Sequence, residues 1–440
     1  MAPVAASERI AALDVIRGFA VLGILAMNIT GFAFHPAAYG DPTVQGGATG
    51  INLWIFLFHA VLTDGKMRGI FSLMFGAGLI LLARRAEQRG GAALLADIHY
   101  RRMLWLMLFG ILHAFFLWWG DILYPYALLG LVLYPMRRLS PRTLLVVAAL
   151  LLAGMTAVMT GQAFELRSRR DKAAEADAAA SKGAKLTEEQ TEAQKKWKDA
   201  LKELKPGPEE IKKFNEGFGG SFASALKKRA QIVIRWHSAP FYAPMMWDML
   251  GMMFLGMALL KMGVLSAERS YRFYAWMAAV GYAVGIPLHV YPNWSNVAHN
   301  FEVIRLGFNW IPYEPARIAV CLAHVAVLAM VLKAGALRWL TSALEAVGQM
   351  AFTNYIAQSV ICSLAFYGYG FGLYGQLERH QVYYVVLGIW AFQLIASPVW
   401  LRRFRFGPLE WCWRSLTYWR RQPMRIAAPE PAPEAAAAVS

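Results

Sequence analysis

Long apolar runs separated by short polar connections follow one another along most of this chain. The runs are roughly 18 to 25 residues long, about the length that a helix needs to cross the ~30 Å hydrocarbon core of a bilayer. The pattern therefore predicts an all-α, polytopic membrane protein with about ten transmembrane helices. We expect these spans at 11–34, 67–83, 103–119, 122–136, 143–161, 241–260, 271–290, 315–332, 342–364 and 382–401.

One apolar run is too short to cross. The segment 51–62, "INLWIFLFHAVL", precedes the second span. A run of this length is typical of an interfacial or re-entrant helix. We expect it to lie at the membrane surface or to enter the membrane and lead into the second span.

Lysine and arginine gather on alternate connections between the spans. The connections 84–102, 137–142, 261–272 and 333–338 are basic, as is the segment after the last span, whereas 35–50 and 120–121 carry no Lys or Arg. Because short cytoplasmic loops are enriched in these residues, both termini are predicted to be cytoplasmic. The Gly120-Asp121 joint and the connection 63–68 would then face outward.

Two segments differ from the apolar pattern. Residues 162–240 are highly charged, with Glu and Lys three or four apart as on solvated helices, and are interrupted at "KPGP". The span count places this insert outside the membrane, as a helical hairpin between the transmembrane halves 1–161 and 241–421. Residues 422–440, rich in Ala and Pro, are predicted to form a disordered tail.

Composition supports a membrane protein and excludes several other classes. Of 440 residues, 58% are hydrophobic and 16% charged, and the mean hydropathy is +0.38. The net charge is +16, and the basic residues lie beside apolar spans. This placement is typical of the cytoplasmic loops of a membrane protein, so it indicates a lipid bilayer as partner and not nucleic acid. The cysteines Cys321, Cys362 and Cys412 lack metal-ligand spacing, and we expect no metal site.

A histidine and an aspartate stand out in "GILHAFFLWWGDILYPYALLG". His113 lies inside the third span and Asp121 at the joint before the fourth. An ionisable residue inside a membrane indicates a functional site by default, and imidazole is the commonest general base near neutral pH. The alternatives are a neutral His113 bonded to another helix and an Asp121 that only caps the next helix. The two could interact only if the chain bends at the joint.

The first span carries three further polar residues. Asp14 and Arg17 lie three apart on one helical face and could pair at the inner membrane surface. Asn28 lies about 16 Å further out by helical rise. It could bridge helices or contribute to a substrate site.

Two cations lie in an outward-facing connection, against the topology rule. Asp64 could neutralise either Lys66 or Arg68, and the other would hold an anion or carbonyl near the outer mouth or contact lipid phosphate. Together with His113, Asp121 and Asn28, Lys66 would line a polar, outward-facing cavity.

Polar residues also lie inside the later spans. Asn354 and Gln358, four apart, share a helical face, and Asp248 lies in another span. They are predicted either to join helices or to line a polar cavity. His35, in the outer connection 35–50, is a second histidine candidate.

Five motifs occur in an order that resembles the YeiB family of bacterial inner-membrane proteins. They are "LDVIRGFAVLGILAMNI", "FSLMFGAG", "GILHAFFLWWGDILYPYALLGL", "GQMAFTNYIAQS" and "RFGPLEWCWRSLTY". The resemblance covers residues from about 9 to 420 except the charged insert. The C-terminal half of that family is a named domain of unknown function.

The N-terminal half of the family is similar to transmembrane acyltransferases, which include the heparan-glucosamine acetyltransferases. That similarity implies that a cytoplasmic acyl-CoA gives its acyl group, with help from an intramembrane histidine, to a sugar, lipid or amine outside. Arg17 matches the arginine of the first-span motif, and Asn28 stands where sugar O-acyltransferases have histidine. Heparan-type enzymes use a histidine of the next outer loop, for which His35 is the nearest equivalent. His113 belongs to the YeiB pattern.

The resemblance thus implies an acyltransferase of the bacterial inner membrane with no tightly bound cofactor and acyl-CoA as donor. His113 would deprotonate the acceptor, Asp121 would hold the imidazole or the acceptor, and Arg17 with the connection 84–102 would lie near the CoA phosphates. One alternative is a transporter or flippase for a polar or lipid-linked substrate. Another is a membrane scaffold that acts through the insert 162–240.

Overall fold

The regular structure is helical, as predicted. The computed structural model describes residues 10–88, 94–237 and 239–426, and the only β pairing in these ranges is an isolated bridge between Phe404 and Arg425. The elements are α1 Ala11–Ala33, η2 Pro36–Tyr39, α2 Gly50–Leu62, α3 Lys66–Gln88, α4 Leu95–Phe116, α5 Leu123–Met136, α6 Pro141–Ser181, α7 Glu188–Leu204, α8 Pro208–Gly219, α9 Phe222–Trp236, α10 Ala239–Lys261, α11 Tyr271–Ala298, α12 Val303–Lys333, α13 Arg338–Gln349, α14 Ala351–Phe366, α15 Arg379–Leu401 and α16 Pro408–Tyr418.

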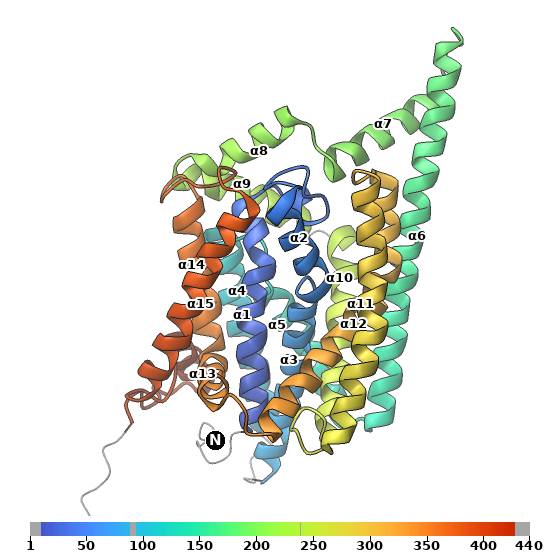
Figure 1. Cartoon of the computed structure of the whole chain (residues 1–440). Coiled ribbons are helices and arrows are strands. Elements are labelled where there is room, and N and C mark those ends of the chain that lie inside the picture. Colours follow the sequence, from blue (N-terminus) through green and yellow to red (C-terminus); the bar gives the residue numbers. More distant parts are fainter. Residues whose placement is uncertain (1–9, 89–93, 238, 427–440) are drawn as a thin grey trace, which may run out of the picture.

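Most of these helices run side by side in one bundle (Figure 1). The short helix α13 and the start of α1 lie at one end, which we call the inner end. Helices α7, α8 and α9 of the charged insert lie across the other, the outer end, and α6 projects beyond it. Helix α7 ends at Leu204 and α8 begins at Pro208, so the insert is interrupted at the predicted KPGP sequence.

The protein has the helices of a membrane protein. Within the described residues, six helical stretches are long and apolar enough to cross a bilayer: Ala11–Ala33, Gly50–Gln88, Pro141–Ser181, Tyr271–Ala298, Val303–Lys333 and Arg379–Leu401. Leu123–Met136 and Ala351–Phe366 are shorter apolar helices. Each of the ten predicted spans lies mostly on helical residues, and the number of crossings stays a prediction.

The predicted span 342–364 is two helices instead of one. The chain breaks at Met350 between α13 and α14. The carboxylate of Glu410, on α16, accepts the backbone N–H groups of Phe352 at 2.7 Å and Thr353 at 3.1 Å. An external acceptor for the first N–H groups of a helix stabilises a new helix start. Glu410, in the last of the five sequence motifs, therefore fixes where α14 begins.

The insert is packed on the bundle. Phe218 of α8 and Ile232 of α9 belong to one buried apolar cluster with Trp118 and Trp119 from the α4–α5 connection. Arg229, also on α9, is fully buried, and its Nε donates to the Phe115 carbonyl at 3.0 Å. The outer side of the α4–α5 connection is therefore closed by the insert.

The C-terminal segment is ordered further than predicted. Residues 422–426 follow α16 and pair with the segment after α15: Arg405 N–H donates to the Met424 carbonyl at 2.9 Å, and Ile426 N–H donates to the Arg403 carbonyl at 3.2 Å. The remainder of the predicted tail, 427–440, lies outside the described residues.

Glycines allow α1 and α13 to touch at the backbone. A Cβ atom on Gly18 would lie 1.9 Å from the Leu344 carbonyl oxygen, and one on Gly348 would lie 1.9 Å from the Asp14 carbonyl oxygen. Atoms cannot approach that closely, so any side chain would force the helices apart. Small residues at such crossings are typical of helix packing in membranes. This contact fixes α13, and with it the start of α14, against α1.

The Gly18→Ala variant is predicted to destabilise the protein by about 1–3 kcal/mol, because the new methyl group overpacks a contact between two backbones. Thermal unfolding of the detergent-solubilised protein would measure the change. Gly388→Ala is the matched control, since a Cβ there would meet nothing within 4 Å. Equal unfolding temperatures for the two variants would contradict the close packing of α1 on α13.

Candidate active site

His113 and Asp121 are in contact inside the bundle. His113 Nδ1 lies 2.8 Å from Asp121 Oδ1, and both residues are buried. The other ring nitrogen, Nε2, lies 2.8 Å from the hydroxyl oxygen of Ser359 on α14. The two residues could interact only if the chain bends at the Gly120-Asp121 joint, and the structure has this bend. It joins a carboxylate, an imidazole and a hydroxyl in one chain of hydrogen bonds.

The α4–α5 hairpin explains how Asp121 reaches back. Helix α4 ends at Phe116 and α5 begins at Leu123. A Cβ on Gly110 would lie 2.3 Å from the Tyr124 backbone nitrogen, so glycine lets the two helices meet closely. The second oxygen of Asp121 accepts the Tyr124 N–H at 2.7 Å. Asp121 thus caps α5 and holds His113 at the same time. The two roles that the sequence offered as alternatives for Asp121 therefore occur together.

The hydrogen bonds define the histidine tautomer. A carboxylate can only accept hydrogen bonds, so the proton of the neutral imidazole lies on Nδ1, facing Asp121. Nε2 is then an acceptor and receives the Ser359 hydroxyl proton. This order of groups, with a base between an orienting carboxylate and a hydroxyl, is the arrangement that activates a nucleophile.

A cleft at the inner end reaches toward this chain of groups. It encloses about 250 Å³. Its lining includes Leu106, Leu123, Tyr126 and Tyr355. The ring of Tyr355 lies against His113, with 5.1 Å between the ring centroids. Tyr355 therefore separates the end of the cleft from the imidazole.

The mouth of the cleft is basic. It is lined by arginines from four elements: Arg17 of α1, Arg85 of α3, Arg102 of α4 and Arg414 of α16. Arg17 pairs with Asp14 at 2.7 Å, as predicted. The Arg102 guanidinium lies over the Trp413 ring at 4.3 Å, and its backbone carbonyl accepts the Trp413 indole N–H at 3.0 Å. Arginines in this number can bind a polyanion.

The cleft at the inner end differs in its lining from the predicted outward-facing cavity. The cleft beside His113 lies at the inner end, and neither Asn28 nor Lys66 lines it. Trp118, Trp119 and the insert fill the outer side. Asn28 is buried on α1, where its backbone carbonyl accepts the Tyr39 hydroxyl at 3.4 Å.

His35 lies at the outer end, apart from His113. Its Nδ1 accepts the Ala37 N–H at 3.2 Å, and its ring contacts Phe214 of the insert with 4.4 Å between centroids. Burial and the nearby Lys228 lower the pKa of His35 to about 4, although Glu210 opposes the shift. His35 therefore caps η2 as a neutral ring. None of the contacts recorded for the described residues joins it to Asp121 or Ser359.

Asn354 and Gln358 face another helix. Asn354 Nδ2 donates to Ser397 Oγ at 3.0 Å, and Gln358 Nε2 donates to Gln393 Oε1 at 2.9 Å. Gln393 Nε2 donates in turn to the Asn354 carbonyl at 2.8 Å. These amides join α14 to α15, as in the helix-joining alternative.

Lys66 and Arg68 occupy different positions from those predicted. Helix α2 leads into α3, and the joint lies inside the bundle, roughly 20 Å along from the start of α2 by helical rise (Figure 1). The Lys66 side chain is fully buried, and its Nζ donates to the Ala60 carbonyl at 2.6 Å. A cation at the C-terminal end of a helix satisfies its free carbonyls. The segment 51–62 is thus the outer part of an apolar stretch that is long enough to cross a bilayer and is broken into two helices, α2 and α3.

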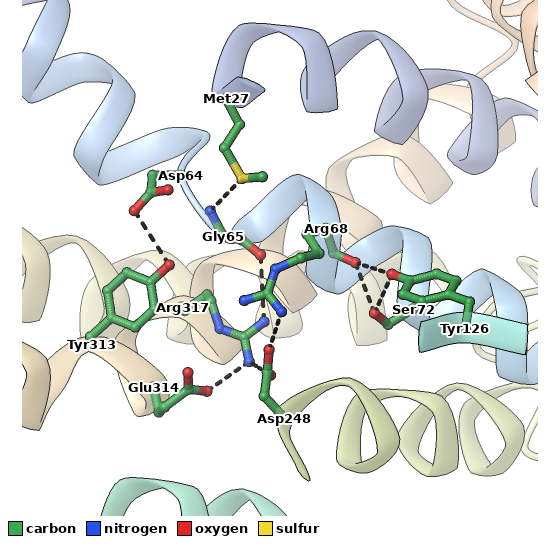
Figure 2. Close-up of polar contacts among 10 residues, drawn as sticks. All are labelled: Met27, Asp64, Gly65, Arg68, Ser72, Tyr126, Asp248, Tyr313, Glu314 and Arg317. Atoms are coloured by element: carbon green, nitrogen blue, oxygen red, sulfur yellow. Dashed lines mark hydrogen bonds and ion pairs between the residues drawn. The ribbon is translucent and has the colours of Figure 1, made fainter. Parts of the chain in front are cut away.

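Arg68 belongs to a buried cluster of charges (Figure 2). Arg68 and Arg317 of α12 converge on Asp248 of α10, with Arg68 Nη1 at 2.7 Å from Oδ2. Arg317 also contacts Glu314 at 2.7 Å and donates to the Gly65 carbonyl at 3.4 Å. Two arginines and two acids balance one another here. The cluster ties α3, α10 and α12 together, and Asp248 is its centre.

Sequence reasoning missed Ser359, Arg317 and Glu314. Ser359 lies four residues after Tyr355, so the helical period places both on one face of α14. Nothing in one sequence shows that this face meets His113. Arg317 and Glu314 lie beside Pro312 and Pro315 near the start of a predicted span, where charges resemble an ordinary span boundary.

The described residues contain no group of three or more His, Cys, Asp or Glu placed to hold a metal ion. Cys321 and Cys362 are buried, Cys412 is partly buried, and all three are free thiols.

Comparison with known proteins gives the family. Residues 259–420 match the family model described as "Protein of unknown function (DUF418)". The "Uncharacterized protein YeiB" of Escherichia coli is 30% identical over 422 residues, which cover 93% of this chain and 96% of that protein. The chain belongs to the YeiB family. The "Uncharacterized protein YxaH" of Bacillus subtilis is 29% identical over 442 residues, covering 96% and 97% of the two chains. No solved structure matches.

Asp248→Asn is predicted to destabilise the protein strongly, by about 3–5 kcal/mol, because it leaves two buried arginines without their shared carboxylate. Thermal unfolding in nanodiscs measures the effect. Asp97→Asn is the control: its pair with Arg101, at 2.5 Å, has an aspartate side chain that is 59% exposed. Loss of an exposed pair changes stability by no more than about 1 kcal/mol. Similar unfolding temperatures would show that the Asp248 cluster does not hold α3, α10 and α12 together.

Proposed function

We propose that this member of the YeiB family is a membrane acyltransferase. It takes an acyl group from cytoplasmic acyl-CoA and passes it to an extracytoplasmic sugar, lipid or amine. One observation carries the proposal: a cleft with four arginines at its mouth ends at Tyr355, whose ring lies against a carboxylate-bound histidine. In this reading the protein lies in the bacterial inner membrane, with both termini in the cytoplasm.

The mouth of the cleft suits the phosphates of CoA. Guanidinium groups bind phosphate oxygens in pairs, and a concave basic surface raises the local concentration of an anionic ligand. The positive-inside rule explains arginines at an inner end, but it does not explain why those of α1, α3, α4 and α16 line one cleft. The resemblance alone places Arg17 and the connection 84–102, which includes Arg85 and Arg102, near the phosphates.

The deep part of the cleft suits a thioester and a short acyl chain. Besides the arginines, the cleft is lined by apolar side chains that include Met103, Leu106 and Phe352. About 250 Å³ is too small for a complete acyl-CoA. The nucleotide would therefore remain among the arginines while the thin arm carrying the thioester enters.

His113 supplies the base. Its Nε2 is free of a proton because Asp121 holds the proton on Nδ1, and a neutral imidazole accepts a proton from a hydroxyl or amine that attacks a thioester. Asp121 then stabilises the imidazolium, as an orienting carboxylate does in hydrolases. Both residues are buried, which excludes bulk water from competing as acceptor.

A transporter is the second candidate, because α2 and α3 form a discontinuous apolar helix with the buried Lys66 at the joint between its two parts. Discontinuous helices with charged groups inside the membrane are typical of transporter substrate sites. Movement of a polar or lipid-linked substrate across proteoliposomes without CoA release would favour it. CoA release that depends on His113 would favour the acyltransferase.

The His113→Gln variant is predicted to slow CoA release from acetyl-CoA by roughly 10²- to 10⁴-fold, the usual contribution of a general base, while acetyl-CoA still binds. Radiolabelled acetyl-CoA and the purified protein in nanodiscs give both quantities. His299→Gln, an exposed histidine at the end of α11, is the control. A His113→Gln protein as active as the control would remove His113 from the chemistry.

The Arg102→Gln variant is predicted to weaken acetyl-CoA binding by about tenfold or more, since a charge-assisted hydrogen bond contributes about 1.5–3 kcal/mol. Equilibrium binding in nanodiscs reports the Kd. Arg138→Gln serves as control, because Arg138 is an exposed arginine that follows α5 and does not line the cleft. An unchanged Kd in Arg102→Gln, or an equal loss in both variants, would argue against a phosphate site at the mouth.

A further inference from the structure

Ser359 has the surroundings of a nucleophile. Its hydroxyl oxygen lies 2.8 Å from His113 Nε2, and the same imidazole lies 2.8 Å from Asp121. We infer that Ser359 attacks the thioester and carries the acyl group as a serine ester before it reaches the acceptor. This inference rests on the proposed acyl transfer and adds a covalent intermediate to it.

The hydroxyl proton has a preferred partner. Ser359 Oγ can also donate to the Tyr355 carbonyl of its own helix, but at 3.5 Å that contact is at the limit of a hydrogen bond. His113 Nε2, which carries no proton in this tautomer, is a closer and stronger acceptor. A serine with its proton directed at an oriented imidazole is the arrangement found in nucleophilic acyl transfer.

The position of Ser359 along α14 suits a residue that carries the acyl group from the donor to the acceptor. The cleft at the inner end is lined by Tyr355, and Ser359 lies one helical turn beyond Tyr355, toward the outer end. A rotation of the Tyr355 side chain would open the end of the cleft to Ser359. An acyl group on Ser359 has then left CoA and passed the barrier formed by Tyr355. The carrier thus separates a donor at one end of the bundle from an acceptor at the other.

The two steps balance without any further reactant. Ser359 Oγ forms a bond to the thioester carbonyl carbon, its proton moves to His113 Nε2, the carbon–sulfur bond breaks, and CoA leaves as the thiol after taking that proton. An acceptor hydroxyl, amine or water then attacks the serine ester. Its proton passes through His113 to Ser359 Oγ as the ester bond breaks.

The chain offers a matched control on the same helix. Ser363 lies four residues after Ser359, is equally buried, and its hydroxyl contacts the backbone carbonyls of Ser359 and Val360. No recorded contact among the described residues joins Ser363 to a histidine. A Ser363→Ala variant therefore tests removal of a buried hydroxyl from α14, and Ser359→Ala tests removal of the one held by His113.

The test is acid-quenched labelling of the full-length protein in nanodiscs with radiolabelled acetyl-CoA, followed by mass spectrometry of its peptides. We expect an acetyl group on Ser359 in the unchanged protein and in Ser363→Ala. We expect loss of the label and at least about a hundredfold slower CoA release in Ser359→Ala. A Ser359→Cys variant should carry its label as a thioester, which neutral hydroxylamine removes faster than it removes a serine ester.

Three outcomes would overturn the inference, and they differ in their effect on the proposed function. CoA release that is unchanged in Ser359→Ala leaves acyl transfer standing but rules out the carrier. Slower release with no label on any serine makes Ser359 a positioning residue for His113. Absence of both acetyl-CoA binding and CoA release in the unchanged protein removes the acyltransferase together with its carrier.

Discussion

A polar group buried in an apolar helix bundle must find its partner inside the bundle, because neither lipid nor water is there to satisfy it. This constraint decides how the helices of this protein meet. Asp248 gathers Arg68 and Arg317, and so joins α3, α10 and α12. Amides join α14 to α15 through Asn354 and Ser397. His113 joins α4 to α14 through Ser359, and Asp121 returns at the α4–α5 joint to complete the chain.

The two polar centres nevertheless differ in what they can do. In the Asp248 cluster the charges are balanced, and neither Asp248 nor Arg317 lines the cleft at the inner end. Such a cluster stabilises a particular packing of helices. At His113 the imidazole keeps an acceptor nitrogen directed at a hydroxyl, and the Tyr355 ring lies against the imidazole and also lines a cleft with a basic mouth. A proton can move there, and a substrate can approach from the inner end.

The sequence predicted the features that depend on composition and period, and failed where the answer depends on which faces meet. The length of the apolar runs located the helices. The contact between His113 and Asp121 was expected on the condition that the chain bends at the Gly120-Asp121 joint. The cleft at the inner end was not predicted, because the sequence does not show which helix faces meet there or that the insert packs on Trp118 and Trp119. Lys66 was misplaced because a short polar sequence can form either an exposed loop or a break between two helices inside the bundle, and the sequence alone does not distinguish the two. Ser359 was missed because a buried serine has no sequence signal of its own.

The central claim is that the arginine-lined cleft receives an acyl-CoA with its thioester directed at His113. The most direct measurement is an electron cryomicroscopy structure of the protein in nanodiscs with a non-hydrolysable acyl-CoA analogue. We expect phosphate density among Arg17, Arg102 and Arg414 and an acyl end against Tyr355 or beyond it. A cleft occupied by lipid at saturating analogue, or an analogue bound elsewhere, would contradict it.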